Sequence, residues 1–175
     1  MKSSITRAAA LAVLSLCSTA ALADPTVFNL ELGTTSEDQM KSLYVAEHIG
    51  INKYSNGNMY SIPTREVSFN GVKEITVIFD TSGVLAAVLT TFPKSKFNYL
   101  NEIMDGKYRK TSEQIPFVGN KLAKYRDGET EITLDSPHMS FDMSLNYIRN
   151  DFMHTFRQRS ASDERTKRTQ EASQL

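Results

Sequence analysis

The sequence predicts an α+β domain in which antiparallel β-meanders pack against two short helices, with a helix or tail at the C-terminal end. Three observations predict this class. Several segments alternate apolar and polar residues with a period of two, and two segments carry apolar residues at helical spacing. Dipeptides that favour tight turns separate the alternating segments, namely Asn56-Gly57, Asn70-Gly71 and Asp127-Gly128. Because such turns join neighbouring antiparallel strands, we expect an antiparallel sheet.

The first 23 residues have the layout of a cleavable secretory signal peptide. Lys2 and Arg7 provide a positive start, and an apolar run over residues 8–17 follows. Alanines occupy the −3 and −1 positions before Asp24, which predicts cleavage there. The apolar run is too short to span roughly 30 Å of hydrocarbon, so we expect export rather than anchoring. The expected compartment is the periplasm, and secretion beyond it is the alternative.

The mature chain is expected to contain no cysteine, because the one cysteine of the sequence, Cys17, lies in the leader. This excludes thiol catalysis, disulfide exchange and cysteine metal sites. The remaining 152 residues can bury a core without disulfides. They carry 18 basic and 20 acidic residues, a formal net charge of −2, which gives no field to attract nucleic acid or an anionic membrane. No second apolar run has the length of a transmembrane helix.

The first segments of the mature chain predict a strand followed by a capped helix. Residues 27–32 alternate, with apolar side chains on one face, as in a half-buried strand. Thr35 or Ser36 can cap the next helix, and Asp38 or Gln39 then stands at the position of a capping box. A short helix is therefore expected directly after this cap.

The middle of the chain predicts hairpins and a central strand. Asn56-Gly57 separates the apolar residues of 51–54 from those of 59–62, which indicates a hairpin. Residues 75–79 alternate and form the next expected strand. The mostly apolar run over 84–92 is typical of a strand with neighbours on both sides.

A second helix and a further meander are expected after Pro93. Ser95 can cap this helix, and its apolar stripe consists of Phe97, Leu100, Ile103 and Met104. Alternation then predicts strands over 121–125, 130–134 and 139–147. In the last of these strands, alternate apolar residues are expected to face the core, namely Met139, Phe141, Met143, Leu145 and Tyr147.

We divide the chain into the leader (1–23), one α+β domain (24–157) and a polar C-terminal tail (158–175). Residues 28–92 run strand, helix, hairpin, hairpin, and residues 95–147 run helix and three strands. Two similar helix-plus-meander halves on one sheet are therefore an alternative description. The tail is interpreted as a solvated end, with a functional basic segment as the alternative, carried by Arg157, Arg159, Arg165, Lys167 and Arg168.

The histidine and methionine positions do not predict a metal site. His48, His138 and His154 lack the spacing of ligand pairs on one element. The alternative is a copper site with soft ligands drawn from His138, Met139, Met143, Met153 and His154. We interpret Met139 and Met143 as core residues instead, since methionine fills irregular cores. No catalytic, cofactor-binding or metal residue is assigned, and no cofactor is expected.

The acidic residues favour exposed positions over a catalytic or calcium site. Four of them lie close together without the offsets of a calcium loop, namely Asp127, Glu129, Glu131 and Asp135. Glu74 comes nearest to a buried carboxylate, but Thr76 follows it on the same strand face. The sequence also lacks a Gly-x-Ser-x-Gly elbow and a phosphate-binding glycine loop. A non-enzymatic protein is therefore expected.

The block Leu32-Gly33-Thr34-Thr35-Ser36 leads into the first predicted helix, and hairpins and a second helix–meander unit follow it. In this order of elements, residues 28–147 resemble small secreted proteins of Gram-negative bacteria. They also look distantly like the envelope domains typified by BamE. The resemblance implies a helix packed on an antiparallel meander. Domains of that type carry two helices before the sheet and a lipidated cysteine, and this chain shows neither.

These observations favour a non-enzymatic module that binds another envelope or periplasmic protein through a sheet face or edge. One alternative is a periplasmic inhibitor or immunity-type protein, for which Thr111–Asn120, with Pro116 and Gly119, is the candidate protruding loop. Another alternative is a small-ligand carrier with a large apolar pocket between helix and sheet. A further alternative is an enzyme with a dispersed site. It would have a cleft in which a carboxylate lies beside one of three histidines, His48, His138 or His154.

Overall fold

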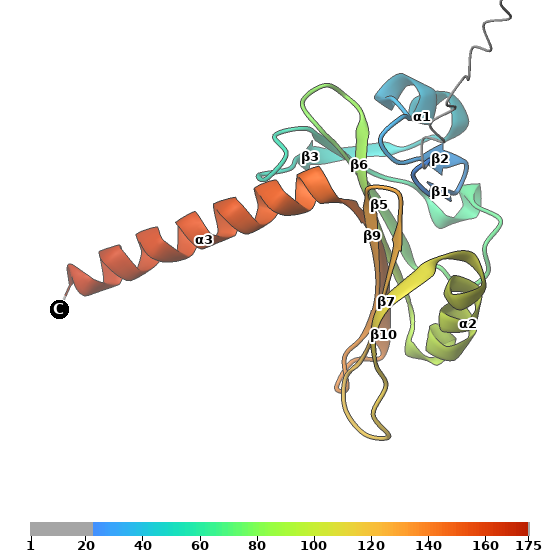
Figure 1. Ribbon diagram of the computed structural model, residues 1–175. Coiled ribbons are helices and arrows are strands. Elements are labelled where there is room, and N and C mark those ends of the chain that lie inside the picture. The colour runs from blue at the N-terminus through green and yellow to red at the C-terminus, as the bar shows by residue number, and fades with distance from the viewer. Residues whose placement is uncertain (1–22, 175) are drawn as a thin grey trace, which may run out of the picture.

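The structure is a computed structural model that describes residues 23–174. In this part of the chain an eight-stranded antiparallel sheet, a separate two-stranded hairpin and three α-helices form an α+β fold (Figure 1). The predicted fold class is therefore confirmed. The predicted leader, apart from Ala23, lies outside the described residues.

The helices are α1 (Glu37–Leu43), α2 (Phe97–Lys107) and α3 (Asn150–Ala172), and short 3-10 turns cover Thr64–Glu66 and Lys94–Lys96. The two-stranded hairpin consists of β1 (Thr26–Val27) and β2 (Leu30–Glu31). The main sheet consists of β3 (Glu47–Ile51), β4 (Asn58–Ser61), β5 (Glu74–Phe79), β6 (Leu85–Pro93), β7 (Arg109–Gln114), β8 (Lys121–Asp127), β9 (Thr130–Ser136) and β10 (Asp142–Arg149).

The main sheet consists of two similar halves that join at its centre. Its strand order is β3-β4-β5-β6-β10-β9-β8-β7, so each half is a meander of four consecutive strands. Helix α1 precedes the first meander and α2 precedes the second. The central strands β6 and β10 pair antiparallel, with Val88 opposite Tyr147, so an approximate two-fold axis relates the halves. This topology matches the alternative description as two helix-plus-meander halves. Strand β6 has neighbours on both sides, as the apolar run over 84–92 predicts.

One face of the sheet carries the hydrophobic core. Val77, Val88 and Leu145 of the central strands belong to the same buried cluster as Met40 of α1 and Leu100 of α2. Figure 1 shows α1, α2 and the β1–β2 hairpin on this face, whereas α3 leaves the sheet on the other side. The sheet therefore positions two helices on one face and leaves much of the other face open.

The segment predicted as one strand over 27–32 is a tight hairpin instead. Phe28 and Asn29 both adopt positive φ angles, of 50° and 59°, as the two central residues of a type I′ turn do. The apolar alternation still reports burial, because Val27, Leu30 and Leu32 are all buried. A turn at Phe28 was not predictable, since bulky side chains disfavour the left-handed conformation.

The predicted capping box is confirmed in α1 but the predicted cap of α2 is wrong. The backbone N–H of Gln39 donates to the Ser36 hydroxyl, and the Ser36 N–H donates to the Gln39 side chain. Ser95 instead lies inside the short turn Lys94–Lys96, and α2 begins without a side-chain cap. Pairing of β6 continues to Pro93, so the chain turns tightly there before α2 starts.

Strand β7 was not predicted, and its sequence explains why. Its six residues are polar and almost all exposed, so no alternation marks them. The strand lies at the edge of the sheet, where β8 is its only paired strand. Part of the predicted loop Thr111–Asn120 therefore belongs to β7, and the loop itself covers residues 115–120.

Helix α3 continues well beyond the point where the sequence predicts a fraying tail. Its first half contacts the β3–β4 loop: the Phe156 ring lies 4.5 Å from the Tyr54 ring, Arg159 donates to Asn56 at 3.0 Å, and Asp163 pairs with Lys53 at 3.6 Å. Residues 161–172 are exposed on all sides, which agrees with their polar composition. Figure 1 shows this part projecting away from the sheet. In residues 23–174 no helix combines the length and the apolar character needed to cross a membrane.

Candidate functional site

Exposed apolar side chains gather on two neighbouring loops at one end of the sheet. The β7–β8 loop (residues 115–120) and the β9–β10 loop (residues 137–141), here called the loop pair, lie at the lower end of the sheet in Figure 1. Phe117 is 103% exposed, Met139 91% and Phe141 93%. Neither loop contains Asp, Glu, Lys or Arg. Clustered apolar side chains of this kind mark interaction sites on soluble proteins.

Hydrogen bonds hold the loop pair in one arrangement. The His138 N–H donates to the Asn120 side chain at 2.7 Å and so joins the two loops. The Lys94 amine donates to the carbonyls of Pro137 and His138 at 2.7 and 2.8 Å, and the Lys94 N–H donates to the Phe141 carbonyl at 2.8 Å. The exposed rings are therefore presented by a preorganised backbone, which lowers the entropy cost of binding.

The prediction that Met139 and Phe141 lie in the core is wrong. Met143, Leu145 and Tyr147 are buried as expected, but β10 begins only at Asp142. Its pairing with β6 ends opposite Pro93, so the residues before Asp142 have no neighbouring strand. Alternation indicates which face a side chain points to, but burial also requires a sheet around it.

The residues considered for metal or catalytic sites do not come together. His48 on β3 contacts Asn58 at 3.2 Å and the Tyr60 ring, whereas His138 lies in the loop pair and His154 on α3. The methionines of the copper alternative are also separated, since Met143 is buried and Met139 exposed. Among the described residues no group of three or more His, Cys, Asp or Glu side chains could hold a metal ion.

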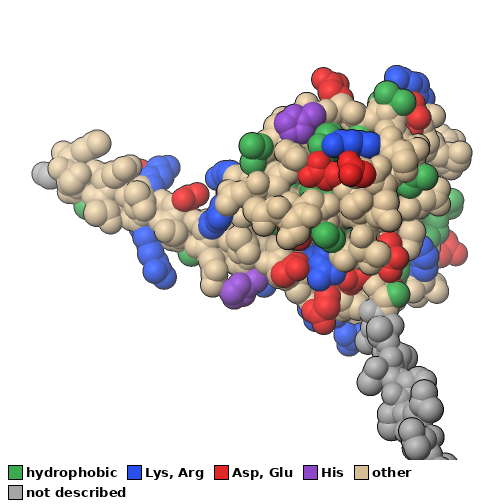
Figure 2. Space-filling model, turned by 90° about the horizontal axis from the view of Figure 1, so that it is seen from above, with side chains coloured by type: hydrophobic (Ala, Val, Ile, Leu, Met, Phe, Trp, Pro, Cys, Tyr) green, Lys and Arg blue, Asp and Glu red, His purple; other side chains and the backbone are tan. Residues whose placement is uncertain are grey.

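The acidic residues considered for a catalytic or calcium site lie at exposed or partly exposed positions, as the sequence favours. Glu74 is exposed on β5 and accepts a hydrogen bond from the Thr91 hydroxyl at 3.2 Å. Glu131 pairs with Lys124 of the neighbouring strand at 3.3 Å. Figure 2 shows acidic and basic side chains interspersed over the visible face and along α3, without a large area of one sign. This distribution does not favour a charged ligand on that face.

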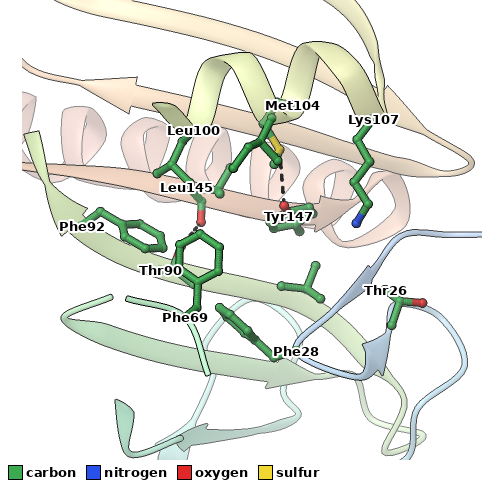
Figure 3. A pocket seen from close by; sticks show the side chains of 12 residues that line it. Thr26, Phe28, Phe69, Thr90, Phe92, Leu100, Met104, Lys107, Leu145 and Tyr147 are labelled. Atoms are coloured by element: carbon green, nitrogen blue, oxygen red, sulfur yellow. Dashed lines mark hydrogen bonds between the residues drawn. The ribbon is translucent and has the colours of Figure 1, made fainter. Parts of the chain in front are cut away.

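An apolar pocket of about 170 Å³ lies between α2, the β1–β2 hairpin and the centre of the sheet (Figure 3). Thr90 and Leu145 line it from β6 and β10, and Leu100 and Met104 line it from α2. Its position between helix and sheet is the one that the carrier alternative predicts. Its volume is smaller than the usual 300–1,000 Å³ of ligand pockets.

Two similar polar clusters tie α1 and α2 to equivalent strands of the two halves. In the first, the Tyr60 hydroxyl of β4 donates to Glu37 of α1 at 2.7 Å, and the Asn58 amide donates to the same carboxylate at 3.0 Å. Lys41 pairs with Glu37 at 3.4 Å. Burial acts to raise the pKa of Glu37, but the hydrogen bonds from Tyr60, Asn58 and Lys41 outweigh it, and the pKa lies below its usual value.

In the second cluster, the Tyr125 hydroxyl of β8 lies 2.9 Å from Asp105 and 2.6 Å from the Asn101 side chain of α2. Lys110 pairs with Asp105 at 2.7 Å, and their hydrogen bond lowers the pKa of Asp105 and raises that of Lys110. Burial, followed by the hydrogen bond to Asp105, raises the pKa of Tyr125. We interpret both clusters as structural ties between helix and sheet.

Glu37→Gln is expected to reduce the loss of stability in acid. A carboxylate whose folded pKa is depressed stabilises the fold above its unfolded pKa, near 4.5, and this contribution is lost as the pH falls through the folded pKa. The free energies of unfolding of wild type and variant should therefore converge between pH 7 and pH 3. Urea unfolding at several pH values measures both, and a difference that stays constant with pH would contradict the expectation.

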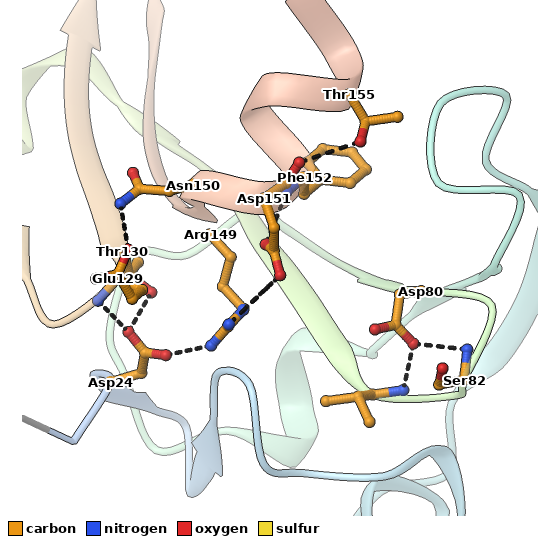
Figure 4. A network of polar contacts seen from close by, with 11 residues as sticks. Asp24, Asp80, Ser82, Glu129, Thr130, Arg149, Asn150, Asp151, Phe152 and Thr155 are labelled. Atoms are coloured by element: carbon orange, nitrogen blue, oxygen red, sulfur yellow. Dashed lines mark hydrogen bonds and ion pairs between the residues drawn. The ribbon is translucent and has the colours of Figure 1, made fainter. Parts of the chain in front are cut away.

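The residue after the predicted cleavage site is anchored in a polar network (Figure 4). The Asp24 carboxylate accepts from the Glu129 N–H at 2.8 Å and from the Thr130 hydroxyl at 3.0 Å. It also forms an ion pair with Arg149, at the end of β10. Arg149 in turn pairs with Asp151 at 3.4 Å. Asp24 is therefore held against the domain by its side chain.

Sequence reasoning named the β7–β8 half of the loop pair, within the candidate protruding loop Thr111–Asn120, but missed the β9–β10 half. Pro116 and Gly119 flank Phe117, and Pro137 precedes Met139, so apolar residues inside turn-rich segments were the available signal. Comparisons of the chain with protein-family models, with curated proteins and with solved structures found no match.

Proposed function

We propose that the protein is an exported, non-enzymatic binding module that docks on a protein partner through the loop pair. The observation that carries this proposal is the exposure of Phe117, Met139 and Phe141 on two braced, uncharged loops. Fully burying one such side chain contributes about 1.5–3 kcal/mol, so three of them can serve as the anchors of an interface. The layout of the leader supports export.

The charges around the loop pair favour a protein over a lipid surface as the partner. Lys94 already donates to two loop carbonyls, and Lys73 forms an ion pair with Asp142 at the start of β10. The formal net charge expected of the mature chain is −2. Peripheral membrane binding depends on basic side chains that are available around the inserted apolar ones, and Lys73 and Lys94 are both engaged in contacts within the protein.

The internal two-fold relation indicates what kind of surface the partner offers. Tyr54 is the third residue of the β3–β4 loop (52–57), as Phe117 is the third residue of the equivalent β7–β8 loop. The Tyr54 ring packs at 4.5 Å against Phe156 of α3, whereas Phe117 is fully exposed. An apolar helix face of the partner, placed on Phe117 as α3 is placed on Tyr54, is therefore the occupant that we propose.

The inhibitor alternative gains support from the shape of the same surface. The predicted loop Thr111–Asn120 includes the β7–β8 loop, which protrudes from the end of the sheet in Figure 1. A rigid protrusion with an aromatic residue at its tip can enter the recess of an enzyme. This second candidate differs from the first in its consequence, because the partner would be an enzyme that loses activity on binding.

The test is capture of a partner that depends on the loop pair. The full chain with a C-terminal affinity tag is expressed with its leader, and bound periplasmic proteins are identified by mass spectrometry. Replacing both Phe117 and Phe141 by Ser should weaken binding of the captured partner at least 100-fold, because both are proposed anchors. The matched control replaces Val45 and Ile51 by Ser, since both are also exposed apolar residues but lie outside the loop pair.

Equal capture by wild type and the Phe117→Ser, Phe141→Ser variant would overturn the proposal, as would the absence of any protein captured through these residues. Self-association that the double variant abolishes, measured by sedimentation, would replace the partner by a second copy of the chain. Loss of an enzymatic activity of the captured protein on titration would select the inhibitor candidate.

A further inference from the structure

The pocket under α2 has an interior without free polar groups. The Thr90 hydroxyl at its base donates to the Leu145 carbonyl, and the Tyr147 hydroxyl donates to the Met104 sulfur at 3.5 Å. Figure 3 shows both bonds within the ring of lining side chains. A polar ligand would find no hydrogen-bond partner there and would lose its own to water. The interior therefore favours an apolar group.

The volume of the pocket limits the size of that group. An apolar cavity of about 150 Å³ stays dry and accepts a benzene-sized molecule. The 170 Å³ of this pocket therefore matches an alkyl chain of about six carbons or a single ring. Longer chains would have to extend out of the pocket.

The mouth of the pocket carries one cation. Lys107, at the end of α2, is exposed and lines the pocket, and Figure 3 shows its amine directed toward the β1 side. Its amine lies 5.1 Å from the centroid of the Tyr108 ring, and none of the ion pairs among the described residues involves it. It is therefore free to pair with an anionic group of a ligand.

A strained turn also forms part of the mouth. Phe28 adopts a φ of 50°, a left-handed conformation that costs a bulky residue about 1–2 kcal/mol. This conformation places its ring edge-on to Phe69, with centroids 6.4 Å apart, and both rings line the pocket. Backbone strain of this kind persists where the surroundings impose it and is concentrated at binding sites.

We infer that this pocket binds a small anionic amphiphile of the medium-chain carboxylate type. Its alkyl chain lies between α2 and the sheet, and its carboxylate pairs with Lys107 at the mouth. The inference does not depend on the proposed function, because the pocket lies on the helix-covered face and shares no residue with the loop pair.

Titration of the full chain with octanoate, and with octanol as the uncharged probe, tests the inference. The methyl resonance of Met104 should shift saturably with octanoate, whereas that of the exposed Met139 should not. Lys107→Met should weaken octanoate binding about fivefold and leave octanol binding unchanged, as expected for loss of one exposed ion pair. Lys96→Met is the matched control, because the Lys96 amine also lies 5.1 Å from a tyrosine ring, that of Tyr99, away from the pocket.

Ile103→Trp should abolish binding of both probes, because Ile103 is half-buried and lines the pocket. Its circular dichroism spectrum shows whether it folds, and the Met104 shift in wild type gives the location of the probe without any substitution. Absence of saturation up to about 10 mM octanoate, a shift at Met139 alone, or equal octanoate binding by wild type and Lys107→Met would each overturn the inference.

Discussion

Phe92→Ala is expected to lower the free energy of unfolding by about 3–5 kcal/mol, the largest effect of any substitution considered for this protein. Phe92 is 1% exposed on the central strand β6, and its ring packs edge-on against Phe69 with centroids 5.7 Å apart. The substitution loses the favourable free energy of transferring the ring from water into the core. It also leaves a cavity beside the existing pocket, because Phe92 lines that pocket. The pocket cannot collapse fully, because the paired strands hold its base in place.

Phe117→Ala is the matched control, since it deletes the same ring at a fully exposed position. Its effect on stability should stay within about 0.5 kcal/mol. Guanidinium unfolding followed by far-UV circular dichroism suits both variants, because the chain has no tryptophan. Equal destabilisation by the two substitutions would show that Phe117 is packed in the folded protein, and would remove the basis for the loop pair as a binding surface.

Asp24→Ala is expected to destabilise the fold by about 3 kcal/mol. The Asp24 carboxylate is 11% exposed, and its loss leaves two donors without their acceptor, namely the Glu129 N–H and the hydroxyl of the buried Thr130. Leaving the buried Thr130 hydroxyl unsatisfied costs about 1–3 kcal/mol, whereas the Glu129 N–H lies at an exposed position where water can accept from it. The guanidinium of Arg149, which is mostly buried, also loses its closest partner.

Asp151→Ala provides the comparison, because Asp151 pairs with the same guanidinium but is 64% exposed. Exposed ion pairs contribute between 0 and about 1 kcal/mol, so this variant should differ little from wild type. A double-mutant cycle with Arg149→Met isolates the pair energy with Asp24. If both aspartates had the same small effect, the anchoring of Asp24 would not be energetically important for the fold.

The turn dipeptides predicted the strand connections correctly, because a turn depends on the conformations that its own residues allow. Asn56, Gly71 and Gly128 adopt positive φ angles of 57°, 94° and 51° in the folded chain. Asparagine and glycine tolerate this region far better than other residues. The capping box of Ser36 and Gln39 was predictable for the same reason, since its partners are three residues apart.

Strand β7 and the exposed loop residues were not predictable in this way. Residues Arg109–Gln114 form a strand because they pair with the backbone of β8 at the edge of the sheet. No pattern in their own sequence indicates that this partner is present. Met139 and Phe141 continue the alternation of β10 but lie beyond the last paired residues of the neighbouring strands. Their exposure, on which the proposed function rests, depends on where other strands end.

The sequence by itself determined the α+β class, the turns, the capped first helix and the expectation of a cysteine-free mature chain, because these depend on composition or on residues a few positions apart. Only the tertiary structure decided which apolar residues are exposed, where the pocket lies and how Asp24 meets Arg149, 125 positions further along the chain. Burial and ion pairing require groups that are distant in sequence to meet in space. Within the described residues, the arrangement of eight strands and two packed helices brings these groups together. A pattern of neighbouring residues cannot specify such contacts.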